Sequence, residues 1–345
     1  MVTSADLFDI FSQLDREERL FVIEVLTNNF TTLSQCNSVT DFLTEKRFSN
    51  GKVCPICGCI NVVCNGHQKD GKQRYKCKDC GKTFVITSNS IASGTRKSID
   101  TWGMFVQCMV DGYSLRRCAK KCRIHKNTAF AWRHKILDSL QEVLSSTVLE
   151  GIIEADETFF NVSYKGNHKH STFTMPRKSR KRGKSTKTRG ISKQKVCVPC
   201  AISRNGFAFS VISNLGRISI KNLHNAFDNK LQPNSILCTD KLSSYRQFSK
   251  DYNLNLIQLK SGKSKQGIYN IQHINNYHKE LKEFIDGFHG VSTKYLNNYL
   301  TWYSFIYQCN HLDENIAAKL LTLTLKLGKK ICNNQLSRRP AIPLP

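Results

Sequence analysis

Four cysteines are spaced for metal binding. Cys54 and Cys57 form one Cys-x-x-Cys pair, and Cys77 and Cys80 form a second pair after 19 intervening residues. Two such pairs at this separation allow four thiolates to surround one zinc ion tetrahedrally. The ion then supplies folding energy that about thirty residues cannot obtain from an apolar core. The spacing predicts a structural Zn²⁺ site in a zinc ribbon over residues 49–90.

The other cysteines have a different interpretation. Cys197 and Cys200 fall in a predicted strand, where residues three apart point to opposite faces, so we expect core cysteines and no shared metal. Cys59 and Cys64 are spare thiols, and His67 is a weaker competing ligand because soft thiolates already fill the zinc shell.

Two aspartates end apolar runs that are typical of strands. Asp156 follows Ile152 and Ile153, and Asp240 closes the run 236–239. On a strand, Glu154 and Asp156 share one face and Glu157 lies on the other. Carboxylates suit Mg²⁺, which needs oxygen ligands and keeps waters that substrate phosphates can replace. The pattern predicts that Asp156 and Asp240 bind a divalent ion in a cleft.

The net charge indicates a polyanionic partner. Lys and Arg number 52 against 26 Asp and Glu, a net charge of +26, while residues 1–50 carry eight acids and four bases. The remaining 295 residues therefore hold +30. Such an excess favours double-stranded DNA, because each neutralised phosphate releases counterions.

Composition excludes several classes. Hydrophobic residues at 40% suffice for a core, which excludes a wholly disordered basic tail. No apolar run approaches the length of a membrane span, and no signal-peptide pattern begins the chain. We expect a cytoplasmic, nucleoid-associated protein with reduced cysteines and no membrane partner.

Helical patterns flank the zinc module. An acidic, amphipathic helical segment is expected over 1–48, and three helices over 97–148 are typical of a helix-turn-helix DNA-binding domain. Ser114 and Asn127 or Thr128 are the expected caps of its second and third helices. The residues of this domain expected to face DNA are Arg116, Arg117, Lys120, Lys121, Arg133 and Lys135, together with His134.

Beyond Glu150 the pattern predicts an α/β domain. Strands are expected over 151–160, 195–203, 206–213 and 235–239, and helices over 218–231, 275–288 and 293–327. A basic run between the first two strands predicts a loop that binds phosphates, with Arg177, Lys178, Arg180, Lys181 and Arg182 as its leading contacts.

These motifs together resemble a known family. The zinc ribbon, the helical DNA-binding segment, the Ala-Asp-Glu-Thr motif at 155–158, the Thr-Asp pair at 239–240 and the block from His273 to Trp302 are similar to insertion-sequence transposases. The branch is the one with an N-terminal zinc ribbon, related to Merlin elements. The resemblance covers about residues 50–310.

The resemblance implies a DDE-type transposase. It implies an RNase H-like catalytic domain over 150–312, followed by a helical tail over 313–345. The implied reaction is DNA cleavage and strand transfer at terminal inverted repeats, with two Mg²⁺ or Mn²⁺ ions. Since two ends must be cut together, a homodimer or larger assembly on DNA is expected.

The third acid of the family pattern does not match. His278 stands where relatives often have Glu, and the resemblance implies that Asn275 or His278 serves with Lys282. On a helix these three residues, at offsets of 0, 3 and 7, share one face. Glu280 and Glu283 remain alternatives. An imidazole suits Mn²⁺ better than Mg²⁺. Because His278 stands in place of the expected acid, a catalytically inactive DNA-binding regulator derived from a transposase is the alternative function. A nuclease or resolvase on the same fold is another.

Overall fold

The computed structural model describes residues 39–167, 174–177, 190–259, 265–326, 335–336 and 338–344. The chain forms two compact units, one from Met1–Gln107 with Ala317–Gly328 and the other from Cys108–Ile316 with Lys329–Pro345. Residues 1–38 of the acidic helical segment expected over 1–48 lie outside the described residues, as do Lys178, Arg180, Lys181 and Arg182. No described helix is long and apolar enough to cross a membrane.

The first unit contains a small antiparallel sheet. Its strands are β1 (Val62–His67), β2 (Gln73–Cys77) and β3 (Thr83–Phe84), in the order β1-β2-β3. Tyr75 and Phe84 are buried with ring centroids 5.5 Å apart, and Phe48 packs edge-on to Tyr75 at 5.0 Å. This aromatic cluster is a core too small to fold the sheet alone. The helices α3 (Val39–Arg47), most of α4 (Ile99–Val110) and most of α11 (Ile316–Lys326) belong to the same unit.

The second unit begins with two helices joined by a short turn. They are α5 (Leu115–Lys121) and α6 (Lys126–Leu144). The side chain of Ser114 accepts a hydrogen bond from the backbone N–H of Arg117, which confirms the predicted cap. The predicted cap of α6 was wrong: His125 caps it by accepting from Asn127 N–H, so α6 begins before Asn127.

A mixed sheet forms the centre of this unit. Its strands are β4 (Ile152–Asn161), β5 (Lys195–Ser203), β6 (Ala208–Ser210), β8 (Ile236–Thr239) and β9 (Asn255–Gln258). The spatial order is β6-β5-β4-β8-β9, and β7 (Asn214–Leu215) also pairs with β5. The first three strands are antiparallel, whereas β8 and β9 run parallel to β4. This is the mixed sheet of an RNase H-like α/β fold, as expected.

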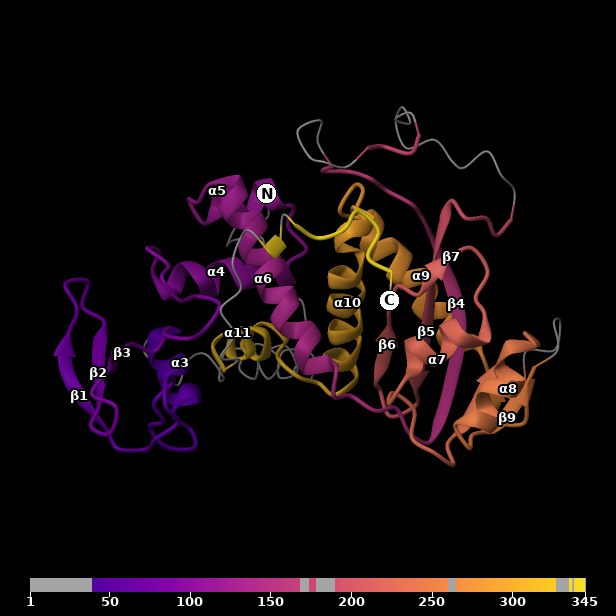
Figure 1. Ribbon diagram of the computed structural model, residues 1–345, viewed down its shortest axis with the longest axis horizontal. Helices are drawn as coiled ribbons and strands as arrows, with labels where there is room; N and C mark the ends of the chain where they lie inside the picture. Colours follow the sequence, from indigo (N-terminus) through magenta and orange to yellow (C-terminus); the bar gives the residue numbers. More distant parts are fainter. Residues whose placement is uncertain are drawn as a thin grey trace, which may run out of the picture. The chain divides into compact units, whose positions relative to one another are not determined.

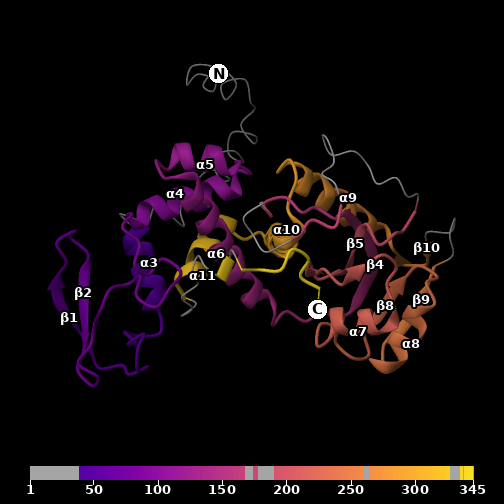
Figure 2. The ribbon, with the colours of Figure 1, turned by 45° about the horizontal axis from the view of Figure 1, so that its top comes forward.

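Helices cover both faces of the sheet (Figures 1 and 2). On one face, α7 (Ile220–Phe227) and α8 (Ser244–Asp251) supply Phe227, Tyr245 and Phe248 to a core that includes Ile153 and Leu237. On the other face lie α9 (Gln272–Asp286) and α10 (Leu296–His311), joined by the short helix η2 (Thr293–Tyr295). A small hairpin of β10 (Lys265–Gln266) and β11 (Tyr269–Asn270) precedes α9.

A buried histidine of α6 packs against η2 and the first turn of α10. His134 is 1% exposed, and its ring lies 4.5 Å from that of Phe130 and 4.2 Å from that of Tyr295. Burial, together with the nearby guanidinium groups of Arg339 and Arg133, lowers the pKa of His134 to about 3. The folded protein therefore holds this imidazole neutral.

The neutral His134 predicts acid sensitivity. Below its ordinary pKa of 6.5, the unfolded chain binds a proton that the folded chain does not bind until about pH 3, so stability falls as the pH falls. We expect the neutral His134 to lower the free energy of unfolding by about 2–3 kcal/mol as the pH falls from 6.5 to 4.5, at about 1.4 kcal/mol per pH unit. Urea unfolding of wild type and His134→Phe at both pH values measures this, and equal pH dependence in the two proteins would contradict it.

Candidate functional site

One aspartate, Asp156, lies on β4, and the other, Asp240, directly follows β8, the adjacent parallel strand. The register of β4 and β8 pairs Glu154 with Cys238, and each aspartate follows two residues later. The two carboxylates are close enough for Asp240 to raise the pKa of Asp156, although 84 positions separate them. Leu242 N–H donates to Asp240 Oδ1 at 2.9 Å, which holds that carboxylate at the end of β8.

Alternation along β4 sorts its acids by face, as predicted. Glu154 and Asp156 face α9, where Glu154 contacts His273 and Asp156 lies near His278. Glu157 faces α8, where the Tyr245 hydroxyl donates to Glu157 Oε1 at 2.7 Å. Two acids of this strand therefore belong to the α9 side and one to the opposite core.

Helix α9 brings its polar residues to Asp156. His278 is 7% exposed, and its Nδ1 lies 3.7 Å from Asp156 Oδ2. Asn275 and Lys282 are exposed on the same helix. Lys282 lies near enough to influence the pKa of both Asp156 and His278. The structure thus brings His278 and Lys282 to Asp156, with Asn275 one turn before His278.

Burial and crowding shift the pKa values at this site. Burial, opposed by a backbone hydrogen bond from Glu157, reinforced by the Asp240 carboxylate and opposed again by Lys282, raises the pKa of Asp156 to about 6. Burial raises the pKa of Glu157 to about 7, against the hydrogen bond from Tyr245. Burial and then Lys282 lower the pKa of His278 to about 4. Carboxylates crowded in this way repel one another, and a bound cation would relieve that repulsion.

These groups fit a divalent cation. Asp156 and Asp240 offer oxygen ligands, and His278 Nε2 is buried with no hydrogen-bond partner among the described residues. The aspartates and His278 do not form a ready-made set of three ligand atoms within 4.8 Å of one another; in the described chain only the cysteine cluster does so. Ligand atoms this widely separated suit an ion that keeps several water ligands, as Mg²⁺ and Mn²⁺ do.

The glutamates weighed as alternatives are placed differently. Glu280 Oε2 accepts from the Tyr303 hydroxyl at 2.6 Å, and Glu280 Oε1 accepts from Asn276 at 2.8 Å. Those bonds direct Glu280 to α10. Glu283 is exposed. This placement favours His278 over either glutamate as the partner of Asp156.

Sequence reasoning gave Glu154 no role, yet Glu154 ties β4 to α9. Its side chain is 1% exposed; Oε2 accepts from the backbone N–H groups of His273 at 3.1 Å and Ile274 at 3.2 Å. Oε1 lies 2.7 Å from His273 Nδ1 and 3.7 Å from Arg204. The N-cap residue of α9, Ile271, makes no side-chain hydrogen bond, and Asn270 Oδ1 accepts only from the first N–H, that of Gln272, at 3.0 Å. Glu154 accepts from the next two N–H groups and so sets this helix over Asp156. Glu154 also lines a cavity of about 290 Å³ with Arg204, Ser203 and Tyr307.

We expect removal of this tie to destabilise the second unit. Glu154→Ala leaves two helix N–H groups and His273 without their buried acceptor, which should cost about 2–4 kcal/mol of unfolding free energy. Urea unfolding followed by tryptophan fluorescence measures the change. Glu283→Gln, at an exposed position of the same helix, is the matched control and should change stability by less than about 0.5 kcal/mol. A Glu154→Ala protein as stable as this control would show that the hydrogen bonds of Glu154 to α9 do not stabilise the unit.

The four predicted zinc ligands converge. The Sγ atoms of Cys54 and Cys80 lie 3.8 Å apart, those of Cys57 and Cys77 lie 3.6 Å apart, and all four lie within 4.8 Å of one another. Sulfurs bound about 2.3 Å from a tetrahedral zinc are about 3.8 Å apart, so the cluster fits Zn²⁺.

The backbone supports the same site. Gly58 and Gly81, which follow the two pairs, have φ values of +79° and +70°, so each turn favours glycine as predicted. Burial opposes ionisation of Cys54, but hydrogen bonds, led by those from the backbone of Cys57 and Ile56, lower its pKa to about 7. Thiolate is the form that binds zinc.

The basic residues of α5 and α6 divide into two groups. Arg116, Arg117, Lys120 and Lys121 are exposed on α5. Arg133 was wrongly expected to face DNA: it is 1% exposed, donates to the Tyr113 carbonyl at 2.7 Å and packs against the rings of Phe288 and Trp302. His134 is buried too, because this side of α6 packs on α10.

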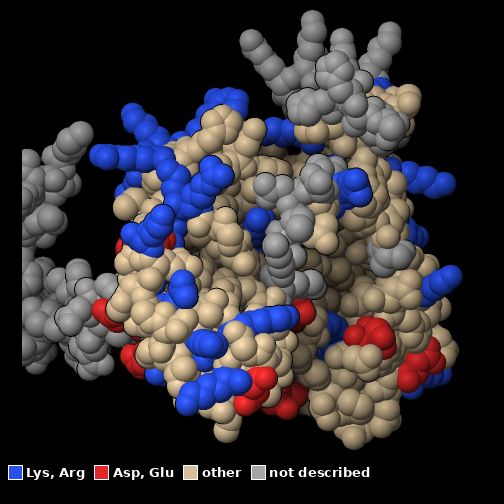
Figure 3. Space-filling model, turned by 60° about the vertical axis from the view of Figure 1, so that its left-hand side comes forward, with Lys and Arg blue, Asp and Glu red and all other residues tan. Residues whose placement is uncertain are grey.

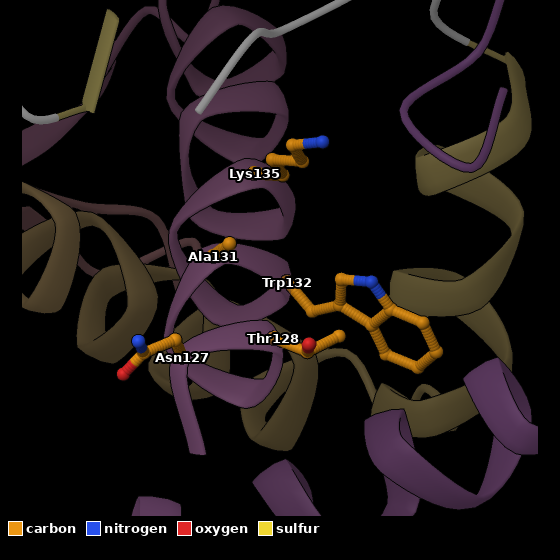
Figure 4. Close-up of a pocket in the computed structure, with 5 residues that line it drawn as sticks. All are labelled: Asn127, Thr128, Ala131, Trp132 and Lys135. Atoms are coloured by element: carbon orange, nitrogen blue, oxygen red, sulfur yellow. The ribbon is translucent and has the colours of Figure 1, made fainter. Parts of the chain in front are cut away.

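Lys135 lies on a different side of α6. It lines a cavity of about 160 Å³ with Asn127, Thr128, Ala131 and Trp132. Figure 4 shows the Lys135 and Trp132 side chains pointing to one side of the helix and Asn127 to the other.

Of the five leading contacts predicted in the basic run, Arg177 is the described one, and it donates to the Val162 carbonyl at 3.3 Å. In Figure 3, Lys and Arg side chains are spread over much of the face in view, while Asp and Glu lie mainly along its lower part.

Comparison with known families agrees with this arrangement. Residues 148–308 match the ISXO2-like transposase domain, and residues 37–83 match the transposase zinc-ribbon domain. The chain thus carries a DDE transposase domain of an insertion-sequence family together with its zinc ribbon.

A curated relative is the "Uncharacterized protein in transposable element ISH50" of Halobacterium salinarum, 27% identical over 151 residues. The match covers 44% of this chain and 48% of the relative, so the chain spans about half the length of that protein.

Two solved structures share a faint likeness. The pre-cleavage Mos1 transpososome is 9% identical, with a TM-score of 0.21 over 69% of this chain and 81% of that one. The Mos1 mariner paired end complex with Mn is 11% identical, with a TM-score of 0.22 over 66% and 79% of the two chains. The transposase domain is therefore assigned from the family matches and the fold from the strand order of this chain.

Proposed function

We propose that this protein is a DDE-type transposase that cuts DNA at the terminal inverted repeats of an insertion sequence and joins the ends to a target. The observation that carries the proposal is the approach of Asp156, on β4, and Asp240, directly after the adjacent parallel strand β8, with His278 and Lys282 supplied by α9. This arrangement supports a centre for phosphoryl transfer. The motif block 273–302 supports the relation to Merlin elements.

Each residue would have a separate task in this reaction. Asp156 and Asp240 would hold divalent ions, with His278 as a further ligand and Asn275 beside it. When bound, such ions supply activation of the attacking oxygen and stabilisation of the departing one. Lys282, exposed near Asp156, would balance charge that develops on the phosphate oxygens. The 3′ hydroxyl released by the cut would then attack the target strand in line, without a covalent protein intermediate.

The helical segment at 97–148 would recognise the transposon ends. In this proposal α5, a short turn and α6 form a helix-turn-helix, and the exposed Arg and Lys side chains of α5 contact the DNA backbone. The basic run at 177–195 would add phosphate contacts. Two ends must be processed together, so the proposal includes a homodimer or a larger assembly on DNA.

A strand-transfer assay tests this function. The purified protein is incubated with duplexes carrying the inverted repeats that flank its coding region and with a plasmid target, in Mg²⁺ and separately in Mn²⁺. We expect cleaved ends and joined products, with more product in Mn²⁺ because an imidazole suits that ion better. Specific binding without product in either ion would refute the transposase and favour the inactive DNA-binding regulator, which the replacement of an acid by His278 makes a definite alternative.

A further inference from the structure

One face of the zinc-ribbon sheet carries a row of cations. Alternate residues of a strand point to opposite faces, and Tyr75 and Cys77 of β2 are buried on the side of the aromatic cluster and the cysteines. Arg74, Lys76 and Lys78 therefore point to the other side. Lys78 follows β2 but continues the pairing, because its N–H donates to the Asn61 carbonyl at 2.9 Å. We propose that these three residues, the basic row, bind the phosphate backbone of double-stranded DNA.

Nothing beside the row on this sheet cancels its charge. The residues opposite Lys76 are Val63 on β1 and Thr83 on β3, both uncharged. The two acids of the ribbon have other contacts: Asp70 pairs with Lys72 at 2.7 Å, and Asp79 accepts from Asn61 at 3.2 Å. Among the described residues, the basic row makes no ion pair within the protein. Its cations remain available to an external anion.

The geometry fits a continuous polyanion. β2 is the central strand of the sheet, and its alternate residues are spaced by about 6.7 Å, so the row spans about 13 Å. Arg74 Nε is a buried donor with no hydrogen-bond partner among the described residues. Three like charges in line repel one another, and a phosphate backbone would relieve that repulsion. DNA is named as the partner because the chain carries a transposase domain, so this inference rests on the proposed function.

The salt dependence of DNA binding tests the basic row. Full-length Lys76→Ala/Lys78→Ala is compared with the control Lys69→Ala/Lys82→Ala, which removes the same charge at exposed positions of the same module. Lys82 pairs with Cys77, on the other face of the sheet. Binding to a fluorescein-labelled 40-base-pair duplex is measured by anisotropy over a range of salt concentrations. Loss of two phosphate contacts should reduce the slope of log K against log salt by about 1.8 and weaken binding about 30-fold at 0.15 M salt. The control should change neither value to that extent.

A footprint on the wild-type protein gives a second measurement that does not depend on a variant folding. Lysines are acetylated with and without the duplex, and mass spectrometry locates the label. We expect the duplex to protect Lys76 and Lys78 but not Lys69. A wild type that binds no duplex would refute the proposed function and this inference together. If the protein binds DNA, but the two variants have equal salt slopes and the duplex does not protect Lys76 and Lys78, the basic row alone is refuted. If polyglutamate protects these lysines and DNA does not, the row binds an acidic protein, and the inference is overturned.

Discussion

Replacement of Asp156 or Asp240 by Asn should lower DNA cleavage and joining at least about a thousandfold, equivalent to about 4 kcal/mol of transition-state stabilisation. Asn has the size of Asp but lacks the negative charge that, in the proposed function, would hold a divalent cation. DNA affinity should stay within about threefold of wild type or rise, because removal of an acid from a cleft reduces repulsion of phosphate. Cleavage rates from single-turnover assays and Kd values from anisotropy separate the two effects.

The control for these variants is Asp313→Asn. Asp313 is exposed after α10 and has a φ of +51°, a conformation that Asn adopts readily. The control should retain wild-type cleavage and folding. If either catalytic variant cleaves as fast as this control, the paired aspartates are not the reaction centre, and the proposed function loses the observation that carries it.

Cys77→Ser should remove zinc from the protein and unfold the ribbon. The Sγ atom of Cys77 is one of four potential ligand atoms within 4.8 Å of one another, and structural zinc in small modules contributes about 10–16 kcal/mol of folding free energy. The ribbon has only a small aromatic cluster to replace that contribution. We expect zinc content to fall from about one ion per chain to nearly none, with rapid proteolysis over residues 49–90 and weaker recognition of transposon ends. Elemental analysis and limited proteolysis measure these changes.

Cys64→Ser is the matched control for the zinc prediction. Cys64 is an exposed thiol of β1 that lies outside the four-cysteine cluster, with Lys52 Nζ 3.8 Å from its sulfur. This variant should keep both the zinc and the protease resistance of wild type. Zinc content unchanged by Cys77→Ser, or lost equally in both variants, would show that the ligands are assigned wrongly.

Several strands could be predicted from sequence, whereas short edge elements could not. The strand expected over 195–203 matches β5, because a continuous apolar run marks a strand buried on both faces. Helix α8 and strand β9 were missed: Ser244–Asp251 has a polar composition, and Asn255–Gln258 is only four residues long. Such segments take their structure from pairing with β8 and from the core beneath them, which local pattern does not report.

The sequence by itself determined what depends on local spacing. The two Cys-x-x-Cys pairs, the glycine turns after them and the division of Glu154, Asp156 and Glu157 between two faces of a strand follow from the geometry of a few consecutive residues. The excess of basic residues likewise needs no fold to indicate a polyanionic partner.

Only the tertiary structure decided which distant residues meet. It brought Asp156 near Asp240, seated α9 on Glu154 and buried Arg133 against α10. Arg133 is the clearest case, because its charge predicted a surface position while its place in α6 faces Phe288 and Trp302. Strand pairing and helix packing depend on contacts made across many residues of chain, and neither the type of a residue nor its near neighbours fixes those contacts.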